Sequence, residues 1–116
     1  MTPREAVQHL LDEEFLFIDP QIYLDKYDFT PAYTDGKIVG YMMHRGGEVH
    51  LLACPGGKMT RRHIRELLVP YFKRYGTLWT SVRKDSPDSF VKRMGFKQTG
   101  GDGVFNFYRL DEVRHA

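Results

Sequence analysis

The apolar positions at the start of the chain follow the period of a helix. Ala6, Leu10 and Leu11 fall at helical spacing, with Thr2 in place as a candidate N-cap. This pattern predicts a helix over residues 3–14. Asp19, a capping residue type followed by proline, predicts the start of a second, shorter helix over residues 20–27.

From residue 29 onward the pattern becomes strand-like. Asp35-Gly36 is a strong hairpin signal, and Gly46-Gly47 marks a second turn. The two turns delimit expected strands over residues 29–33, 38–44 and 48–54, which form an antiparallel meander. The third of these strands is almost unbroken in apolar character from Leu51 to Cys54, which indicates a central strand covered on both faces.

The second half of the chain predicts a helix between two strands, followed by a helix and a hairpin. Apolar residues from Ile64 to Tyr75 repeat with helical spacing, with Thr60 as candidate N-cap and Gly76 as C-cap. The β-rich residues 77–82 follow, so a βαβ unit with a parallel strand pair is expected. Residues 86–94 are expected to form a last helix, and residues 96–99 and 104–110 a closing hairpin.

Composition narrows the class of protein. The chain has 116 residues, 41% of them hydrophobic, and a formal net charge of +2. A chain of this length is expected to form a single domain, residues 1–116, with a core that needs no disulfides, and the lone Cys54 permits none within the chain. No apolar run approaches the roughly 20 residues of a membrane span, and no secretory signal pattern is seen. We therefore expect a cytoplasmic protein without a membrane partner.

The order of the expected elements matches a known family. Residues 90–96 read Phe90-Val91-Lys92-Arg93-Met94-Gly95-Phe96, a late helix that closes with a basic residue and Gly-Phe. Together with the strand-loop-helix-strand crossover, this order resembles the GNAT N-acyltransferase superfamily, most strongly from Glu48 to Phe96. The resemblance implies an α+β fold: a mixed, mostly antiparallel sheet with a parallel, splayed strand pair and flanking helices.

Two short segments carry a narrower resemblance. Tyr75-Gly76-Thr77-Leu78-Trp79 and the late-helix residues 90–95 are similar to segments of GNAT-like proteins of tailed bacteriophages, including small virion or assembly proteins. This implies a second hypothesis, in which the chain keeps the fold as a non-catalytic virion or assembly protein. Its partners are then phage structural proteins, and its location is the host cytoplasm or the virion.

The GNAT resemblance implies acetyl-CoA as the cofactor, bound between the central strand and the long helix. The expected backbone contacts to its pantetheine arm come from Leu52, Ala53 and Cys54. The pyrophosphate is expected at the helix N-terminus, where backbone N–H groups attract anions. Its contacts are expected from two glycines and three cations: Gly56, Gly57, Lys58, Arg61 and Arg62.

That loop departs from the family pattern. Arg62 and Ile64 stand where small residues are usual, and their side chains are expected to obstruct the backbone cradle. The alternative is a glycine turn followed by the solvated start of a basic helix.

Acetyl transfer to an amine requires a base, a group that polarises the carbonyl, and an acid for the leaving thiolate. Glu48 stands where the resemblance places a catalytic glutamate, and His50, on the same strand face, can share or replace that role. The ordinary alternatives are a solvent-facing Glu48 beside a turn and a His50 packed in the core. The expected substrate bears an amine.

The residues implied for the acid are absent. Phe90 and Val91 stand where the family has a tyrosine in the late helix, and the nearest substitutes by type are Ser89 and Tyr108.

Other candidate chemistry has a simpler interpretation. Cys54 is expected to be a small buried hydrophobe rather than a nucleophile, and Trp79 a core residue. The five histidines lack metal-ligand spacing, so no metal is predicted. The basic residues of the long helix lack interleaved aromatics, so they are interpreted as a solvated face and nucleic acid is not an expected partner.

Overall fold

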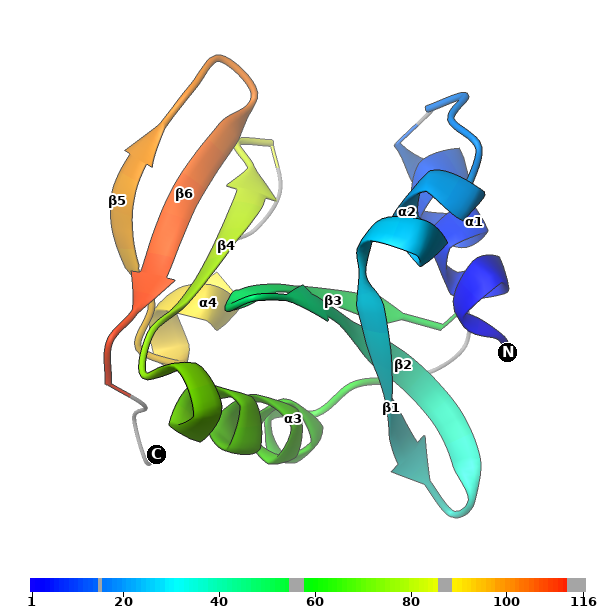
Figure 1. Ribbon diagram of the computed structural model, residues 1–116, viewed down its shortest axis with the longest axis horizontal. Coiled ribbons are helices and arrows are strands. Elements are labelled where there is room, and N and C mark those ends of the chain that lie inside the picture. Colours follow the sequence, from blue (N-terminus) through cyan, green and yellow to red (C-terminus); the bar gives the residue numbers. More distant parts are fainter. Residues whose placement is uncertain (15, 55–57, 86–88, 113–116) are drawn as a thin grey trace.

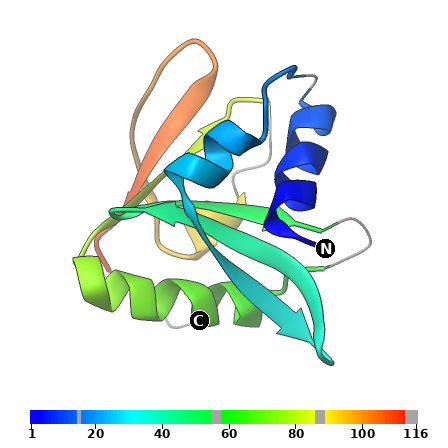
Figure 2. The same cartoon turned by 45° about the vertical axis from the view of Figure 1, so that its right-hand side comes forward.

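The structure, a computed structural model, describes residues 1–14, 16–54, 58–85 and 89–112, without the side chains of Ser89 and Phe90. Within these residues a six-stranded sheet, ordered β1-β2-β3-β4-β6-β5, carries helices on both faces (Figures 1 and 2). The elements in chain order are α1 (Pro3–Glu13), α2 (Gln21–Lys26), β1 (Asp28–Thr34), β2 (Lys37–Arg45), β3 (Glu48–Ala53), α3 (Arg61–Tyr75), β4 (Leu78–Arg83), α4 (Ser89–Arg93), β5 (Lys97–Gly101) and β6 (Phe105–Leu110).

The turns that the sequence predicts are present. Asp35 and Gly36 both have positive φ, 51° and 77°, as a two-residue turn that follows the twist of its strands requires. Gly46 and Gly47 do the same between β2 and β3. The three strands β1, β2 and β3 therefore form the expected antiparallel meander.

The crossover from β3 through α3 to β4 is also confirmed. Thr60 caps α3 by accepting a hydrogen bond from the backbone N–H of His63, and Gly76 ends the helix with a left-handed φ of 75°. The strands β3 and β4 pair in parallel. The expected start of the last helix at residues 86–88 lies outside the described residues, and α4 is described from Ser89.

The parallel pair separates soon after it forms. Glu48 opposite Trp79 is the one residue pair that joins the described parts of β3 and β4. Each strand keeps its outer partner along its length, β3 with β2 and β4 with β6. Beyond this pair the inner edges of β3 and β4 diverge, which Figure 1 shows at the centre of the molecule.

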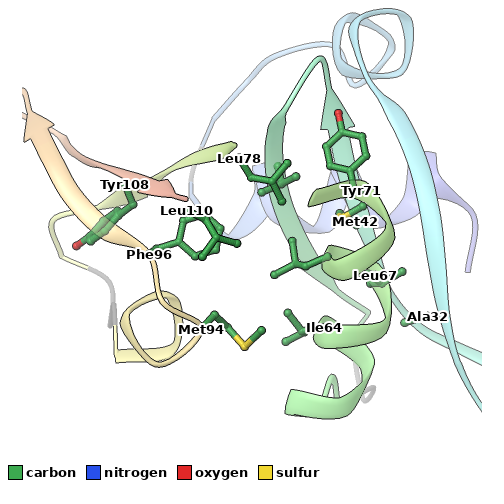
Figure 3. Close-up of a cluster of buried hydrophobic side chains, with 12 residues drawn as sticks. Ala32, Met42, Ile64, Leu67, Tyr71, Leu78, Met94, Phe96, Tyr108 and Leu110 are labelled. Atoms are coloured by element: carbon green, nitrogen blue, oxygen red, sulfur yellow. The ribbon is translucent and has the colours of Figure 1, made fainter. Parts of the chain in front are cut away.

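Two buried clusters hold the helices to the sheet. On one face, Ile64, Leu67 and Tyr71 of α3 point toward sheet residues that include Met42 and Leu78 (Figure 3). On the other face, α1 packs into a second cluster through its three buried residues, Ala6, Val7 and Leu11.

The central strand β3 contributes to both clusters. Val49 belongs to the cluster beneath α3, and Leu52 belongs to the cluster beneath α1. This confirms the prediction of a strand covered on both faces. No helix among the described residues is long and apolar enough to cross a membrane.

The prediction for Trp79 is wrong. Leu78 is fully buried whereas Trp79 is 45% exposed, because successive side chains of a strand point to opposite faces. The indole instead covers the turn between β2 and β3: a Cβ added to Gly47 would come within 2.7 Å of the ring. Glycine at position 47 therefore allows both the positive φ and the close approach of Trp79.

Candidate active site

Three hydrogen-bonded polar side chains lie where β3 and β4 begin to separate. Glu48 and His50 share one face of β3, and the Nε2 atom of His50 lies 2.6 Å from Oε2 of Glu48. Tyr27, which follows α2, donates its hydroxyl to the same oxygen over 2.5 Å. The tyrosine ring also meets the imidazole edge-on, with ring centroids 5.9 Å apart. The structure therefore brings together both residues predicted as bases and adds a tyrosine.

These contacts set the charge of the carboxylate. Burial acts to raise the pKa of Glu48, but the hydrogen bonds from Tyr27 and His50 outweigh it and hold that pKa below its ordinary value. The pKa of Tyr27 is raised, first by burial and then by its hydrogen bond to Glu48. At neutral pH the pair is thus a carboxylate anion and a neutral phenol. Glu48 is a partly buried negative charge, not the freely solvated side chain of the alternative.

The charge on Glu48 determines which ring nitrogen of His50 carries the hydrogen. A carboxylate only accepts hydrogen bonds, so the 2.6 Å contact requires the hydrogen on Nε2. The other ring nitrogen, Nδ1, lies 3.5 Å from the hydroxyl of Thr80 on β4. In the neutral ring, Nδ1 therefore carries the lone pair.

Two cavities meet at these residues. The first, about 480 Å³, lies over the open face of β4, β6 and β5, and the second, about 440 Å³, reaches from α1 and α2 to residues on both sides of the strand divergence. Both are lined by Glu48, His50, Thr80 and Ser81. The carboxylate and the imidazole thus stand where the two spaces join.

The residues predicted to contact pantetheine lie at the end of β3 and directly after it. Leu52 is buried and lines the second cavity, and Ala53 is exposed. Cys54 is buried, and burial raises the pKa of its thiol. The burial of Cys54 agrees with the prediction of a small buried hydrophobe.

The residues predicted to bind pyrophosphate gather around the start of α3. Lys58, Arg61 and Arg62 are all exposed there, whereas Gly56 and Gly57 lie outside the described residues.

The side chains expected to obstruct that helix end make contacts elsewhere. Ile64 is 4% exposed and belongs to the core cluster beneath α3, and Arg62 pairs with Glu66 one turn along the helix, over 3.0 Å. Ile64 therefore points into the core, whereas Arg62 stays exposed at this end of α3.

A histidine that the sequence analysis did not single out fixes this end of α3. The Nδ1 atom of His63 lies 2.9 Å from the backbone N of Thr60, and its Nε2 atom lies 2.8 Å from the hydroxyl of Thr34. The first contact completes a capping box, and the second ties the helix to the end of β1. The basic start of α3 is thereby held against the β1–β2 hairpin.

Of the two residues considered as acids, the structure describes the side chain of Tyr108, which lines the first cavity together with Glu48 and His50. Tyr108 is 1% exposed and belongs to the core cluster beneath α3, opposite Thr80 in the β4–β6 register. Glu48 pairs with Trp79, so its side chain lies on the other face of the sheet. The side chain of Ser89 lies outside the described residues. Among the described residues no group of three or more metal-ligating side chains is found.

Comparison of the chain with known proteins identifies its fold. No family model matches the chain, and no curated protein matches its sequence. Solved structures do match. The N-acetyltransferase PseH of Campylobacter jejuni, solved with acetyl coenzyme A, is 18% identical, with a TM-score of 0.63 over 88% of this chain and 80% of that one.

Two further matches agree. The ribosomal-protein-S18-alanine N-acetyltransferase of Escherichia coli is 14% identical, with a TM-score of 0.66 over 97% of this chain and 90% of that one. The PaiA N-acetyltransferase of Thermoplasma acidophilum, solved with coenzyme A, is 17% identical, with a TM-score of 0.59 over 87% of this chain and 65% of that one. The chain therefore has the GNAT acetyltransferase fold, with one parallel strand pair in a mixed sheet.

Proposed function

We propose that this chain is an N-acetyltransferase that transfers the acetyl group of acetyl-CoA to an amine. The observation that carries the proposal is the divergence of β3 and β4, with the Glu48–His50 pair where it begins and a cavity of about 440 Å³ along it. Two structures of the same fold were solved with acetyl coenzyme A or coenzyme A, which supports the choice of cofactor.

The inner edge of β3 fits the amide-rich arm of coenzyme A. One edge of β3 pairs with β2, and the other edge has separated from β4. Leu51 and Leu52 line the cavity at this second edge. Backbone N–H and C=O groups on an open strand edge can pair with the amides of an extended ligand, as they would with another strand. These groups would hold the arm along β3.

The start of α3 fits the phosphate end of the same molecule. Lys58, Arg61 and Arg62 supply three exposed positive charges beside a helix N-terminus, whose partial positive charge favours anions. When bound, acetyl-CoA supplies the acetyl group as an activated thioester. No metal ion is needed for either contact.

The geometry supports different roles for His50 and Glu48 in removing a proton from the amine. An amine is largely protonated at neutral pH, so a proton must leave its nitrogen before that nitrogen can attack. The lowered pKa of Glu48 makes it a weak base but keeps its negative charge. His50 holds a lone pair on Nδ1, so we assign the proton to that atom, and Glu48, 2.6 Å from Nε2, stabilises the imidazolium that forms.

These two roles are tested by substitution of each residue. Transfer is measured as release of free coenzyme A thiol with a panel of amines, and the acetylated product is identified by mass spectrometry. We expect His50→Gln to lower kcat about a hundredfold or more, because general base catalysis typically contributes at least that much. Glu48→Gln is expected to lower turnover and to change its dependence on pH.

The matched control is His9→Gln. His9 is a partly exposed histidine on α1 that pairs with Glu13 outside the site. This variant is expected to keep the wild-type rate. A wild-type rate in His50→Gln would remove His50 from the reaction. Absence of any transfer, together with absence of acetyl-CoA binding, would favour the non-catalytic phage scaffold that the sequence resemblance also implies.

A further inference from the structure

The first cavity, about 480 Å³, has a floor that combines two aromatic rings with charges of opposite sign. Trp79 on β4 and Phe107 on β6 are 45% and 39% exposed, although both lie in the middle of the sheet. The register places them on the same face as Glu48, because Glu48 pairs with Trp79, and Phe107 pairs with Ser81. Exposed aromatic rings that line a cavity form a surface suited to a flat, apolar ligand.

The positive charge of Arg109 lies on the side of this floor opposite Glu48. Arg109 pairs with Trp79 in the β4–β6 register and lines the same cavity. Its Nε donates to Oδ2 of Asp111 over 3.0 Å, and Asp111 is itself held by the hydroxyl of Thr77. This contact uses Nε and orients the guanidinium, whose terminal amino groups can form a planar, bidentate contact with a carboxylate.

The two charges are separated by a fixed number of strands. Glu48, Trp79 and Arg109 lie opposite one another on β3, β4 and β6. Two strand spacings put the backbones of Glu48 and Arg109 about 10 Å apart. The hydrogen bonds from Tyr27 and His50 both go to Oε2 of Glu48, and Oε1 can accept one from a ligand ammonium group.

From this arrangement we infer that the acceptor is a primary amine on a flat, apolar body that carries a carboxylate at its opposite end. The amine lies at Glu48 and His50, the body lies on Trp79 and Phe107, and the carboxylate lies at Arg109. The inference rests on the proposed function and names the class of its second substrate.

The test compares two amines of similar shape, one with a terminal carboxylate and one with a neutral carboxamide in its place. Calorimetry without acetyl-CoA measures the affinity of the protein for 4-(aminomethyl)benzoate and for the neutral 4-(aminomethyl)benzamide. We expect the carboxylate to bind about fivefold more tightly, a modest factor because Arg109 is 56% exposed. In Arg109→Gln the two affinities are expected to be equal. In the control Arg93→Gln, an exposed arginine on α4 outside the cavity, the preference is expected to remain.

Equal affinity of the wild-type protein for both amines, or no binding of either, would overturn the inference. A preference that persists in Arg109→Gln would also overturn it. Acetyl-CoA is titrated separately, so the proposals fail in different ways. Binding of acetyl-CoA without the carboxylate preference contradicts only the substrate class, whereas an Arg109-dependent preference without acetyl-CoA binding contradicts only the acetyltransferase function.

Discussion

Substitution Tyr27→Phe removes one hydroxyl from the site and leaves the ring in place. The hydroxyl donates to Oε2 of Glu48 over 2.5 Å, and the ring that remains still stacks on Tyr23. A hydrogen bond to a charged group contributes roughly 1.5–3 kcal/mol. The Glu48 side chain is 27% exposed, so water replaces part of the contact. We expect the free energy of unfolding at pH 7 to fall by about 1–2 kcal/mol.

The loss is expected to depend on pH with a definite sign. The folded-state pKa of Glu48 is lowered below its ordinary value of about 4.3, so its contribution to stability is complete above that pH. It disappears as the pH falls through the folded-state pKa, where the carboxylate is protonated. The destabilisation by Tyr27→Phe is therefore expected to shrink between pH 7 and pH 3.

Urea denaturation at several pH values measures this difference. Tyr33→Phe is the matched control, because it removes the same atom from a tyrosine that is 57% exposed. It is expected to change stability by less than about 0.5 kcal/mol at any pH. A Tyr27→Phe effect no larger than the control, or one that is constant from pH 7 to pH 3, would refute the reasoning about the Glu48 charge.

Two further variants test the cofactor site and the core. Arg61→Glu combined with Arg62→Glu is expected to abolish acetyl-CoA binding with little change in melting temperature, because both side chains are exposed. Lys73→Glu combined with Arg74→Glu makes the same charge change at the other end of α3 and is expected to retain binding; calorimetry compares the two variants. Leu78→Ala is expected to lower the free energy of unfolding by about 2–5 kcal/mol in urea denaturation, since this side chain is fully buried beneath α3, and a loss under 1 kcal/mol would contradict its place in the core.

The fold could be predicted because its signals are local. Asp35-Gly36 and Gly46-Gly47 adopt the positive φ values that their residue types favour, and the apolar period around Ile64 matches the buried side of α3. The order of these elements then limits the topology, because a strand, a helix and a strand in sequence normally cross over to a parallel pair. The structure confirms each of these steps.

The site could be predicted only in part. Glu48 and His50 share a strand face by their spacing, so their contact follows from the period of a strand. Tyr27 is 21 residues from Glu48 and directly precedes β1, which lies beyond β2 from β3, so no local pattern signals the contact. The sequence predicts a core position for Trp79, although alternation from Leu78 places it on the open face.

A calorimetric titration of the protein with acetyl-CoA is the most direct test of the acetyltransferase proposal. We expect saturable binding of one molecule per chain, with a Kd on the order of micromolar, because an open strand edge and three cations are available to the ligand. The same titration of the Arg61→Glu, Arg62→Glu variant is expected to give no binding heat. No heat from the wild-type protein at millimolar acetyl-CoA, with no change in melting temperature, would contradict the proposed function.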